Sequence, residues 1–503
     1  MPRRIIRRAA PFSVWALTLV ISGCIGTGGI APQGSALPVE SLATDQAIQN
    51  AEQDAHWPVA QWWQAYGDPQ LNHWIELAAA SAPSLAMAAA RVRQAKAMAG
   101  VAESAEALHV NGDASLTCPN LANNQLYAPG ALANTTTWDN NASLGLSYSL
   151  DFWGRESNAS EKALDLAHMS AAQGRQAQLE LQDNIVRAYI QLSLNYAQRD
   201  IVEATLAQQQ QILDLAQRRL KGGIGTHFEV SQAETPLPET HRQIDALDEA
   251  IALSRNQLAA LAGKGPGEGA ALQRPTLSLK TALKLPSALP AQLLGQRPDV
   301  VASRWAVAAQ ARGIDVAHAG FYPNVDLIGN LGYMATGGGM LEFLAGKKFN
   351  YSGGPAVSLP IFDGGRLRAE LGEASAGYDL AVAQYNQTLI NALKSISDQL
   401  IRRESMDKQQ VFVSESVASA QKTYDIAKIA YQRGLTDYLN VLNAQTLLFR
   451  QQQIQQQVQA ARLTAHAELV VALGGGLDAG SDVPAEDKTQ APKTPAALAV
   501  FGR

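Results

Sequence analysis

The sequence contains none of the residue patterns that mark an enzyme or a metal site. Its eight histidines are scattered over 503 residues, and it has no His-Glu-x-x-His, Gly-x-Ser-x-Gly, paired cysteines or phosphate-binding loop. The run 337–339 is all glycine, but the lysine and helix of a phosphate cradle do not follow it. Asp151 and Asp363 are expected to cap helices rather than to catalyse. We therefore predict a protein that is not an enzyme and that needs no metal or cofactor.

Basic clusters are also missing after the first 23 residues. Without Arg3, Arg4, Arg7 and Arg8, 36 basic residues remain against 45 acidic ones, a formal charge of −9. A chain with this charge and no basic run is not expected to bind nucleic acid.

Cysteine is nearly absent, and one of the two cysteines lies in an export signal. The four arginines and an apolar stretch from Phe12 to Val20 form a predicted signal peptide over residues 1–23. The segment 21–24, Ile-Ser-Gly-Cys, resembles a bacterial lipobox, so we predict cleavage before Cys24 and a covalent lipid on its thiol. The alternative is an ordinary signal peptide with a chance cysteine. Because Ile25 follows, and not the Asp commonly associated with inner-membrane retention, an outer-membrane destination is favoured.

Cys118 is the only other cysteine. With Cys24 lipidated, no intramolecular disulfide can form, so packing must hold this exported protein together.

Proline is missing from the two long stretches 130–235 and 361–483. Proline removes a helical donor and clashes with the preceding turn, so its absence permits long helices. Apolar residues from Tyr378 to Leu400 recur at steps of three and four, as in a coiled-coil seam. A helix from Gly154 to Leu220 would be roughly 100 Å long at about 1.5 Å per residue. Such a helix belongs to a fibre, a stalk or a tube.

Before each long helix, apolar residues alternate with small or polar ones. The alternation covers 143–152 and 357–361, with further candidates at 325–333 and, more weakly, 110–116. It is typical of transmembrane β-strands, although a strand half-buried in a soluble sheet shows the same pattern. Four strands cannot close a barrel alone, and an open edge cannot persist in lipid, so we expect several copies to assemble.

The second half of the chain repeats the first at an offset of 211 residues. Matching pairs include Gly223 with Gly434 and Val230 with Val441. Each half reads helix–strand–strand–helix–helix, and the first helices begin at Pro83 and Pro298. The predicted segments are an N-terminal part 24–82, a first repeat 83–263, a connector 264–290, a second repeat 291–476 and a flexible tail 477–503.

Several motifs are distributed over the two registered halves in a specific order and spacing. They are Trp62-Trp63, Asp68–Leu71, Leu150–Arg155, Arg297–Val300, Phe321–Asn324, Leu359–Arg366 and Tyr431–Gly434. With these motifs the chain resembles an outer-membrane factor of the TolC type, in the NodT-like lipoprotein branch. The resemblance implies an α+β membrane protein that forms a homotrimer. Its twelve-stranded transmembrane β-barrel would lie in the outer membrane of a Gram-negative bacterium, on a long periplasmic α-helical barrel.

The resemblance further implies the exit duct of a tripartite efflux pump. The chain would dock a periplasmic adaptor and an inner-membrane transporter, and would pass small molecules such as drugs or aromatic compounds. A duct for type I protein secretion is an alternative. A periplasmic adaptor or structural coiled-coil lipoprotein is a third, but an adaptor would normally carry one hairpin and no alternating strand pairs.

By the same resemblance, an iris-like gate lies at the helix tips. Tyr431 is expected to donate a hydrogen bond to Glu229 across the two hairpins. Asn440 and Asn443 replace the family's lumen-facing acids, which predicts weaker cation selectivity. Alternatively, Tyr431 is an ordinary seam aromatic and Glu229 a solvated surface charge.

The tip residues Gly223, Gly225, Gly434 and Thr436 are candidates for adaptor docking, because small residues allow close approach; the alternative is a plain helix stop. An arginine is usual in the family at the position of Thr436, so one gate link is expected to be missing. Pro236 interrupts the first returning helix, which predicts a kink there.

Overall fold

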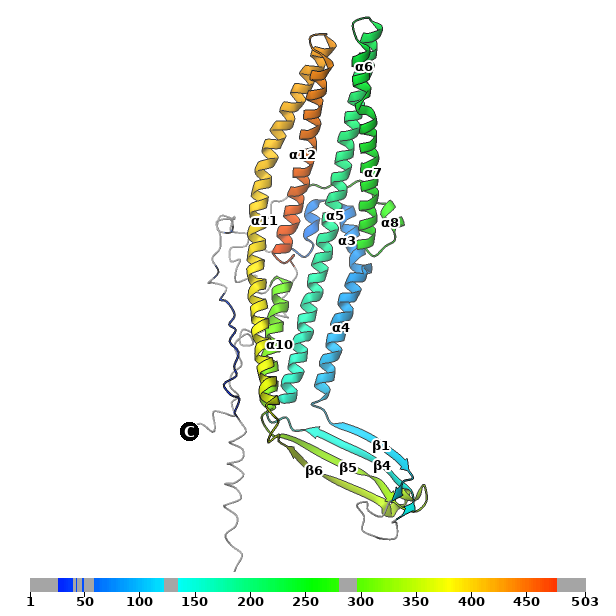
Figure 1. The fold of residues 1–503 in the computed structure, drawn as a ribbon, viewed down its shortest axis with the longest axis vertical. Helices are drawn as coiled ribbons and strands as arrows, with labels where there is room; N and C mark the ends of the chain where they lie inside the picture. Colours follow the sequence, from blue (N-terminus) through cyan, green and yellow to red (C-terminus); the bar gives the residue numbers. More distant parts are fainter. Residues whose placement is uncertain are drawn as a thin grey trace, which may run out of the picture.

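The computed structural model is a long rod of helices that carries a β-sheet at one end (Figure 1). It describes residues 26–38, 42, 48, 58–121, 134–279 and 296–476. The predicted signal peptide, Cys24 and the predicted tail 477–503 lie outside the described residues.

The sheet consists of four antiparallel strands. Their order is β1(His109–Thr117), β4(Asp139–Ser149), β5(Asn324–Thr336) and β6(Phe349–Ser358). The register places Leu331 between Leu144 and Tyr351, and the next row places Asn330 between Gly145 and Ser352. Apolar and small polar rows therefore alternate between the two faces, as the sequence pattern predicts.

Short elements occupy the connections between the strands. β2(Asn120–Leu121) pairs with β3(Thr135–Thr136) between β1 and β4. Two short 3₁₀ helices, η3(Glu342–Leu344) and η4(Gly346–Lys348), lie between β5 and β6.

Two strands end earlier than the alternation predicts, at Ser149 and Ser358. The residues beyond them start the following helices instead. The Asp151 carboxylate accepts hydrogen bonds from the backbone N–H of Arg155 at 2.7 Å and of Ser157 at 2.9 Å. Asp363 does the same for the second long helix, accepting from the Leu367 N–H at 2.8 Å. Both aspartates therefore cap helices, as expected.

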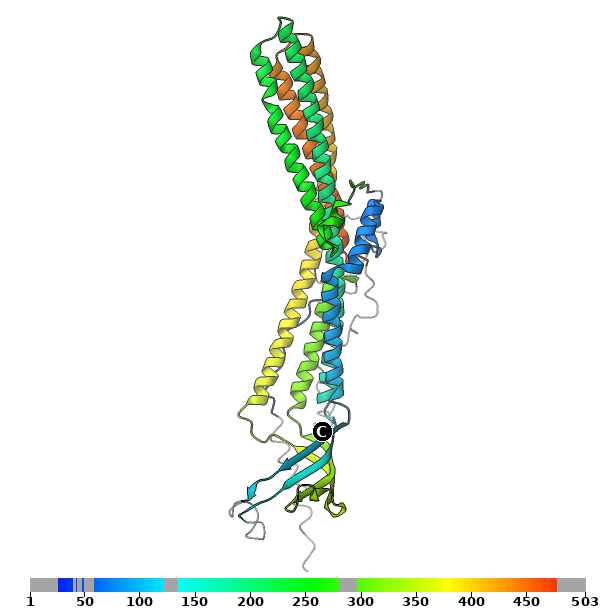
Figure 2. The same cartoon turned by 90° about the vertical axis from the view of Figure 1, so that its right-hand side faces the viewer.

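The helices form a layer that runs the length of the rod (Figures 1 and 2). Next to the sheet lie α4(Pro83–Ser104), α5(Arg155–Lys221), α10(Pro298–Ala319) and α11(Arg366–Gln432). α10 packs between α5 and α11, whereas α4 packs on α5 alone among these helices. Farther from the sheet, α5 returns through α6(His227–Glu234) and α7(Pro236–Leu261), and α11 returns through α12(Tyr438–Ala472).

Both long helices contain 67 residues. Each ends two residues before the glycine that is repeated in the two halves, α5 before Gly223 and α11 before Gly434. The predicted interruption at Pro236 is confirmed, because α6 ends at Glu234 and α7 begins at Pro236. Thr235 keeps helical angles (φ −55°, ψ −42°). Pro236 therefore removes a backbone hydrogen bond, but the chain makes no sharp kink at Thr235. α12, the counterpart of α6 and α7 in the second repeat, runs without a break.

Small elements surround the middle of the rod, namely η2(Trp62–Tyr66), α3(Pro69–Ser81) and α8(Pro266–Ala270). Asp68 joins three segments there. Its carboxylate caps α3 through the Gln70 N–H, and it accepts from the Tyr189 hydroxyl at 2.9 Å and the Thr276 N–H at 2.7 Å.

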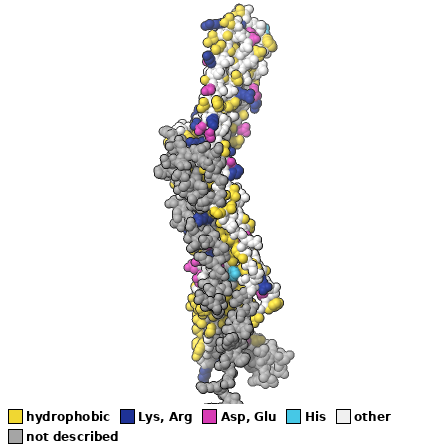
Figure 3. Space-filling model, turned by 90° about the vertical axis from the view of Figure 1, so that its left-hand side faces the viewer, with side chains coloured by type: hydrophobic (Ala, Val, Ile, Leu, Met, Phe, Trp, Pro, Cys, Tyr) yellow, Lys and Arg dark blue, Asp and Glu magenta, His cyan; other side chains and the backbone are white. Residues whose placement is uncertain are grey.

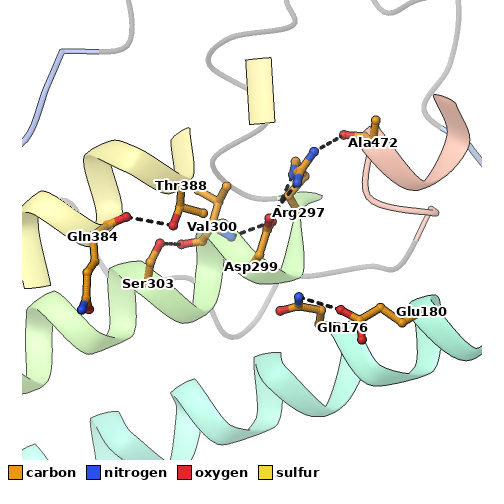
Figure 4. Close-up of polar contacts among 9 residues, drawn as sticks. All are labelled: Gln176, Glu180, Arg297, Asp299, Val300, Ser303, Gln384, Thr388 and Ala472. Atoms are coloured by element: carbon orange, nitrogen blue, oxygen red, sulfur yellow. Dashed lines mark hydrogen bonds and ion pairs between the residues drawn. The ribbon is translucent and has the colours of Figure 1, made fainter. Parts of the chain in front are cut away.

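In each repeat, the end of the returning helix meets the start of the helix next to the sheet. α7 meets α4 in the first repeat, and α12 meets α10 in the second. We call these two places the joints. In the second repeat, the Arg297 guanidinium donates to the Ala472 carbonyl at 2.7 Å and forms an ion pair with Asp299 at 2.7 Å (Figure 4). In the first repeat, the Ser81 hydroxyl donates to the Ala262 carbonyl at 2.8 Å. The joint of the second repeat thus has the charged clamp of Arg297 and Asp299 where the joint of the first repeat has the single hydroxyl of Ser81.

Candidate functional site

The two tips farthest from the sheet are built alike. The Ile224 N–H reaches the Arg219 carbonyl and the Leu435 N–H reaches the Ala430 carbonyl, at 3.0 and 2.9 Å. Gly223 and Gly434 adopt φ of +74° and +73°, which favours glycine. Each long helix therefore ends in a Schellman motif, which satisfies its last carbonyl groups.

The returning helices begin with equivalent caps of different chemistry. Thr226 and Glu229 form a capping box at the start of α6, each side chain accepting from the other's backbone N–H at 3.2 Å. At the start of α12, the Asp437 carboxylate accepts from the Asn440 N–H at 3.2 Å. The Asn440 amide also donates to the Thr436 hydroxyl at 2.8 Å. Asn440 and Asn443 are both exposed.

Tyr431 lies fully buried where the two hairpins meet. The predicted hydrogen bond between Tyr431 and Glu229 is not formed. The Tyr431 hydroxyl has no hydrogen-bond partner among the described residues, and the Glu229 carboxylate is used in the capping box. That part of the prediction is wrong for this conformation, because the cap of α6 takes the acceptor.

Arg219 occupies the place expected for the acid. Its guanidinium carbon lies 4.9 Å from the centroid of the Tyr431 ring, and Nη1 donates to the Tyr431 carbonyl at 3.3 Å. Burial raises the pKa of Tyr431; the charge of Glu229 adds to this, and Arg219 opposes it. Sequence reasoning missed Arg219, although a cation in the last turn of a long helix beside a glycine stop is a readable signal.

Two further tyrosines continue the buried seam. Tyr438 lies with its ring centroid 6.1 Å from that of Tyr431, and burial raises the pKa of Tyr438 to about 12. Tyr424 is buried in the same cluster. These phenols stay protonated at neutral pH, so the tyrosines themselves bring no charge to the seam.

Large apolar side chains project from both tips. Ile224 and Phe228 of the first tip are 70% and 69% exposed, and Leu435 and Leu439 occupy the equivalent positions of the second tip at 76% and 51%. Hydrophobic side chains are visible at this end of the molecule in Figure 3. Such groups on a surface otherwise rich in polar residues are typical of a contact surface. The tip glycines Gly223 and Gly434 immediately precede Ile224 and Leu435 and are exposed, whereas Gly225 is half-buried.

Residues 26–38 run in an extended path along α11. The Asp379 carboxylate accepts from the backbone N–H of Gln33 and Gly34 at 2.8 and 2.6 Å. Nearer the sheet, the Arg368 guanidinium donates to the Gly26 carbonyl at 3.1 Å. Gly26 thus lies beside the first turn of α11, where the chain leaves the sheet.

Within the described ranges, no group of three or more His, Cys, Asp or Glu side chains could hold a metal ion. Among the same residues, none of the helices combines the length and apolar character needed to cross a membrane.

The family of outer membrane efflux proteins matches residues 74–264 and 289–475, which are the two repeats. The chain belongs to this family. As an outer membrane efflux protein it is 45% identical over 476 residues to the fusaric acid resistance protein FusA of Burkholderia cepacia, covering 94% of this chain and 89% of FusA. It is 28% identical to the multidrug resistance outer membrane protein MdtP of Escherichia coli, covering 95% of this chain and 99% of MdtP.

Solved structures agree with this membership. The outer membrane protein VceC of Vibrio cholerae is 34% identical and superimposes with a TM-score of 0.77, covering 84% of this chain and all of VceC. The outer-membrane channel OprN is 25% identical with a TM-score of 0.79, covering 88% and 99%. The efflux protein therefore has the TolC-like fold. It is a non-enzymatic channel of an efflux system in the bacterial outer membrane, and membership of this family implies a homotrimer that works with pump components.

Proposed function

We propose that three copies of the chain close into one tube that serves as the exit duct of a tripartite efflux pump. The observation that carries this proposal is the unequal burial of two equivalent helices. α10 and α4 both contain 22 residues, yet 13 residues of α10 are buried and none of α4. α10 packs against α5 on one side and α11 on the other, whereas among the described residues α5 is the one long helix that packs closely on α4.

The same inequality recurs along the whole rod. α12 lies between α11 and α5, whereas α7 packs on α5 and lacks a second long neighbour. In the sheet, β5 lies between β4 and β6, whereas β1 is an edge strand. Among the described residues, the first-repeat elements α4, α7 and β1 therefore lack a neighbour that their second-repeat counterparts α10, α12 and β5 have, and α11 and β6 of the second repeat form the opposite edge. The α11 and β6 edge of another copy supplies that neighbour, and three copies would give twelve strands.

Copies joined in this way enclose a duct that leads from the helix tips to the sheet. The cargo class that we propose is small molecules, because the names of the relatives FusA and MdtP refer to an organic acid and to multiple drugs. The four exposed apolar side chains at the tips, with Gly223, Gly225, Gly434 and Thr436 between them, would dock the periplasmic adaptor. The adaptor would connect the duct to an inner-membrane transporter.

The proposed gate lies at the same end. Asn440 and Asn443 are exposed amides on α12, and three copies would bring six of them together. Because amides carry no net charge, we expect weaker cation selectivity than in a channel with carboxylates at these places. Tyr431 and Glu229 belong to the gate region, Tyr431 as a buried contact between hairpins and Glu229 as a cap.

We propose a lipid on Cys24 as the membrane anchor. The hydrogen bond between Gly26 and Arg368 supports this, because it holds the chain two residues after Cys24 beside the first turn of α11. The fatty chains would then enter the membrane beside the sheet.

Purified protein in planar bilayers tests the proposed function. We expect stable, multi-state conductance from a species that migrates as a heat-modifiable trimer. A monomer without conductance would contradict the duct. Replacing Cys24 by Ser should abolish labelling by radioactive palmitate, while Cys118→Ser should leave it unchanged.

A further inference from the structure

We propose that Arg219 joins the two tips of one chain into a single moving unit, so that the duct opens along the seams between copies. This inference rests on the proposed function, because it concerns how that duct is gated. In this proposal Arg219 is a positioning residue, and its side chain acts without contacting the cargo.

Arg219 contacts both hairpins at once. Its guanidinium stacks on the Tyr431 ring and donates to the Tyr431 carbonyl on α11. Nη2 donates to the Ile224 carbonyl in its own tip at 3.4 Å. A Cβ atom at Gly434 would lie 3.8 Å from Nη1, so the guanidinium also fits against the turn of the second tip.

This position is favourable for a cation. α5 and α11 both end here, and the C-terminal ends of helices carry partial negative charge. Arg219 therefore interacts with the ends of two long helices while its charge lies over an aromatic face. Because the Tyr431 hydroxyl has no partner among the described residues, the ring and the carbonyl of Tyr431 make the contact rather than the hydroxyl.

Other contacts join the same two hairpins. The Lys428 ammonium donates to the Gln211 side chain at 3.2 Å, and the Gln445 amide donates to the Gln208 side chain at 3.2 Å. One hydrophobic cluster includes Ile212 of the first hairpin together with residues of the second. The tips of one chain thus share a core as well as the arginine contact.

The seam between copies lacks the arginine contact. At the offset of 211 residues, Arg219 corresponds to Ala430 and Tyr431 corresponds to Leu220. In a ring with repeated walls, the seam between copies would place Ala430 and Leu220 where the seam within a chain has Arg219 and Tyr431. An alanine and a leucine form neither a cation–π contact nor a charge-assisted hydrogen bond, so this seam is the weaker one.

Conductance of channel variants in planar bilayers, with potassium chloride as the probe, tests the role of Arg219. Arg219→Gln and Tyr431→Leu should each raise the closed-state conductance severalfold, because a cation–π contact shifts an equilibrium by roughly 2- to 30-fold. Tyr431→Phe keeps the ring and the carbonyl and should match the wild type. Arg218→Gln is the matched control, since Arg218 is exposed and pairs with Asp214 on its own helix.

Cross-linking tests which seam moves. In a Cys118→Ser background, Gln211→Cys with Lys428→Cys allows a short bifunctional thiol reagent to link the two tips of one chain. We expect the linked channel to keep the open and closed conductance levels of the unlinked channel. A linked channel that cannot open would overturn the inference, and so would Arg219→Gln and Tyr431→Leu channels that conduct like the wild type.

Failure of the proposed function would look different. In that case the wild type itself would give no channel in the bilayer. Each variant is first checked for a heat-modifiable trimer, and an Arg219→Lys variant, which keeps the charge, provides a second folded comparison. We expect its conductance to lie between that of the wild type and that of Arg219→Gln.

Discussion

The two repeats have the same order of elements, but their joints, returning helices and sheet-proximal first helices are held differently. The joint of the second repeat is a partly buried Arg297–Asp299 clamp where the first repeat has the Ser81 hydroxyl. The returning helix of the second repeat is continuous where that of the first is broken before Pro236. Its sheet-proximal first helix α10 is enclosed on both sides, whereas α4 is open. The difference teaches that the two repeats form opposite edges of the wall, with α4 and β1 on one side and α11 and β6 on the other, and that each edge would be completed by another copy.

The largest effect is expected at the α4 edge. Met87 and Met98 lie on one face of α4 and are each 58% exposed. If another copy covers this face, charges there would be buried without partners. We expect the double variant Met87→Glu/Met98→Glu to lose the trimer band in gels run without heating, whereas Met87→Leu/Met98→Leu keeps it. Charged variants that assemble normally would show that α4 faces solvent or lumen.

The two joints should differ in strength. Arg297→Ala removes charge-assisted bonds and leaves Asp299 partly buried, which we expect to cost about 2–3 kcal/mol. Ser81→Ala removes one neutral hydrogen bond, which should cost about 1 kcal/mol. Thermal unfolding followed by circular dichroism measures both, and equal shifts would remove this distinction between the repeats.

The tip glycines should also respond unequally. A Cβ atom at Gly225 would lie 2.8 Å from the Leu220 nitrogen, whereas at Gly223 it would meet nothing within 4 Å. Gly223→Ala should cost about 1–2 kcal/mol for the left-handed conformation alone. Gly225→Ala should cost about 1–3 kcal/mol from crowding, although its counterpart Thr436 carries a side chain. Protease cleavage at the tips compares the two variants. We expect the Gly225→Ala variant to be cleaved faster; cleavage of the Gly223→Ala variant alone would show the opposite order.

The smallest expected effect concerns the pH dependence of stability at Asp183 on α5. Burial raises the pKa of Asp183 to about 6; Arg187 opposes the shift and Glu468 adds to it. The folded state therefore binds this proton more tightly than the unfolded state, so ionised Asp183 lowers stability above about pH 6. Asp183→Asn should raise the unfolding temperature at pH 7, and the gain should shrink towards pH 4.

The matched control for this experiment is Asp398→Asn. Asp398 lies on the corresponding long helix and pairs with Lys394 four residues away. Asp398→Asn therefore measures the effect of removing an exposed carboxylate from a long helix. A gain for Asp183→Asn that is the same at pH 4 and pH 7 would contradict the assigned cause.

Most of the fold could be predicted from the sequence, because its signals are local and periodic. Proline-free stretches fixed the long helices, and glycine stops located their ends near Gly223 and Gly434. Strand ends were less predictable, since the alternation continues past Ser149 and Ser358 into residues that cap helices. The 211-residue repeat identified equivalent elements, and packing then showed that α4 and α10 have different surroundings.

The candidate gate was predicted only in part. The position of Tyr431 followed from the repeat and the resemblance, but its contact did not. A capping box and an interhelical hydrogen bond compete for the same carboxylate of Glu229, and a linear sequence does not show which one forms. Arg219 lies on a different hairpin from Tyr431, so their contact depends on how the hairpins pack.

Photo-cross-linking from α4 tests the central claim most directly. A benzophenone amino acid at Met98, in full-length protein in its native membrane, should form cross-linked species of two and three chains. Mass spectrometry should place the second attachment within the sheet-proximal part of α11. Cross-links confined to a single chain, or attached to a different element of the second chain, would contradict the account.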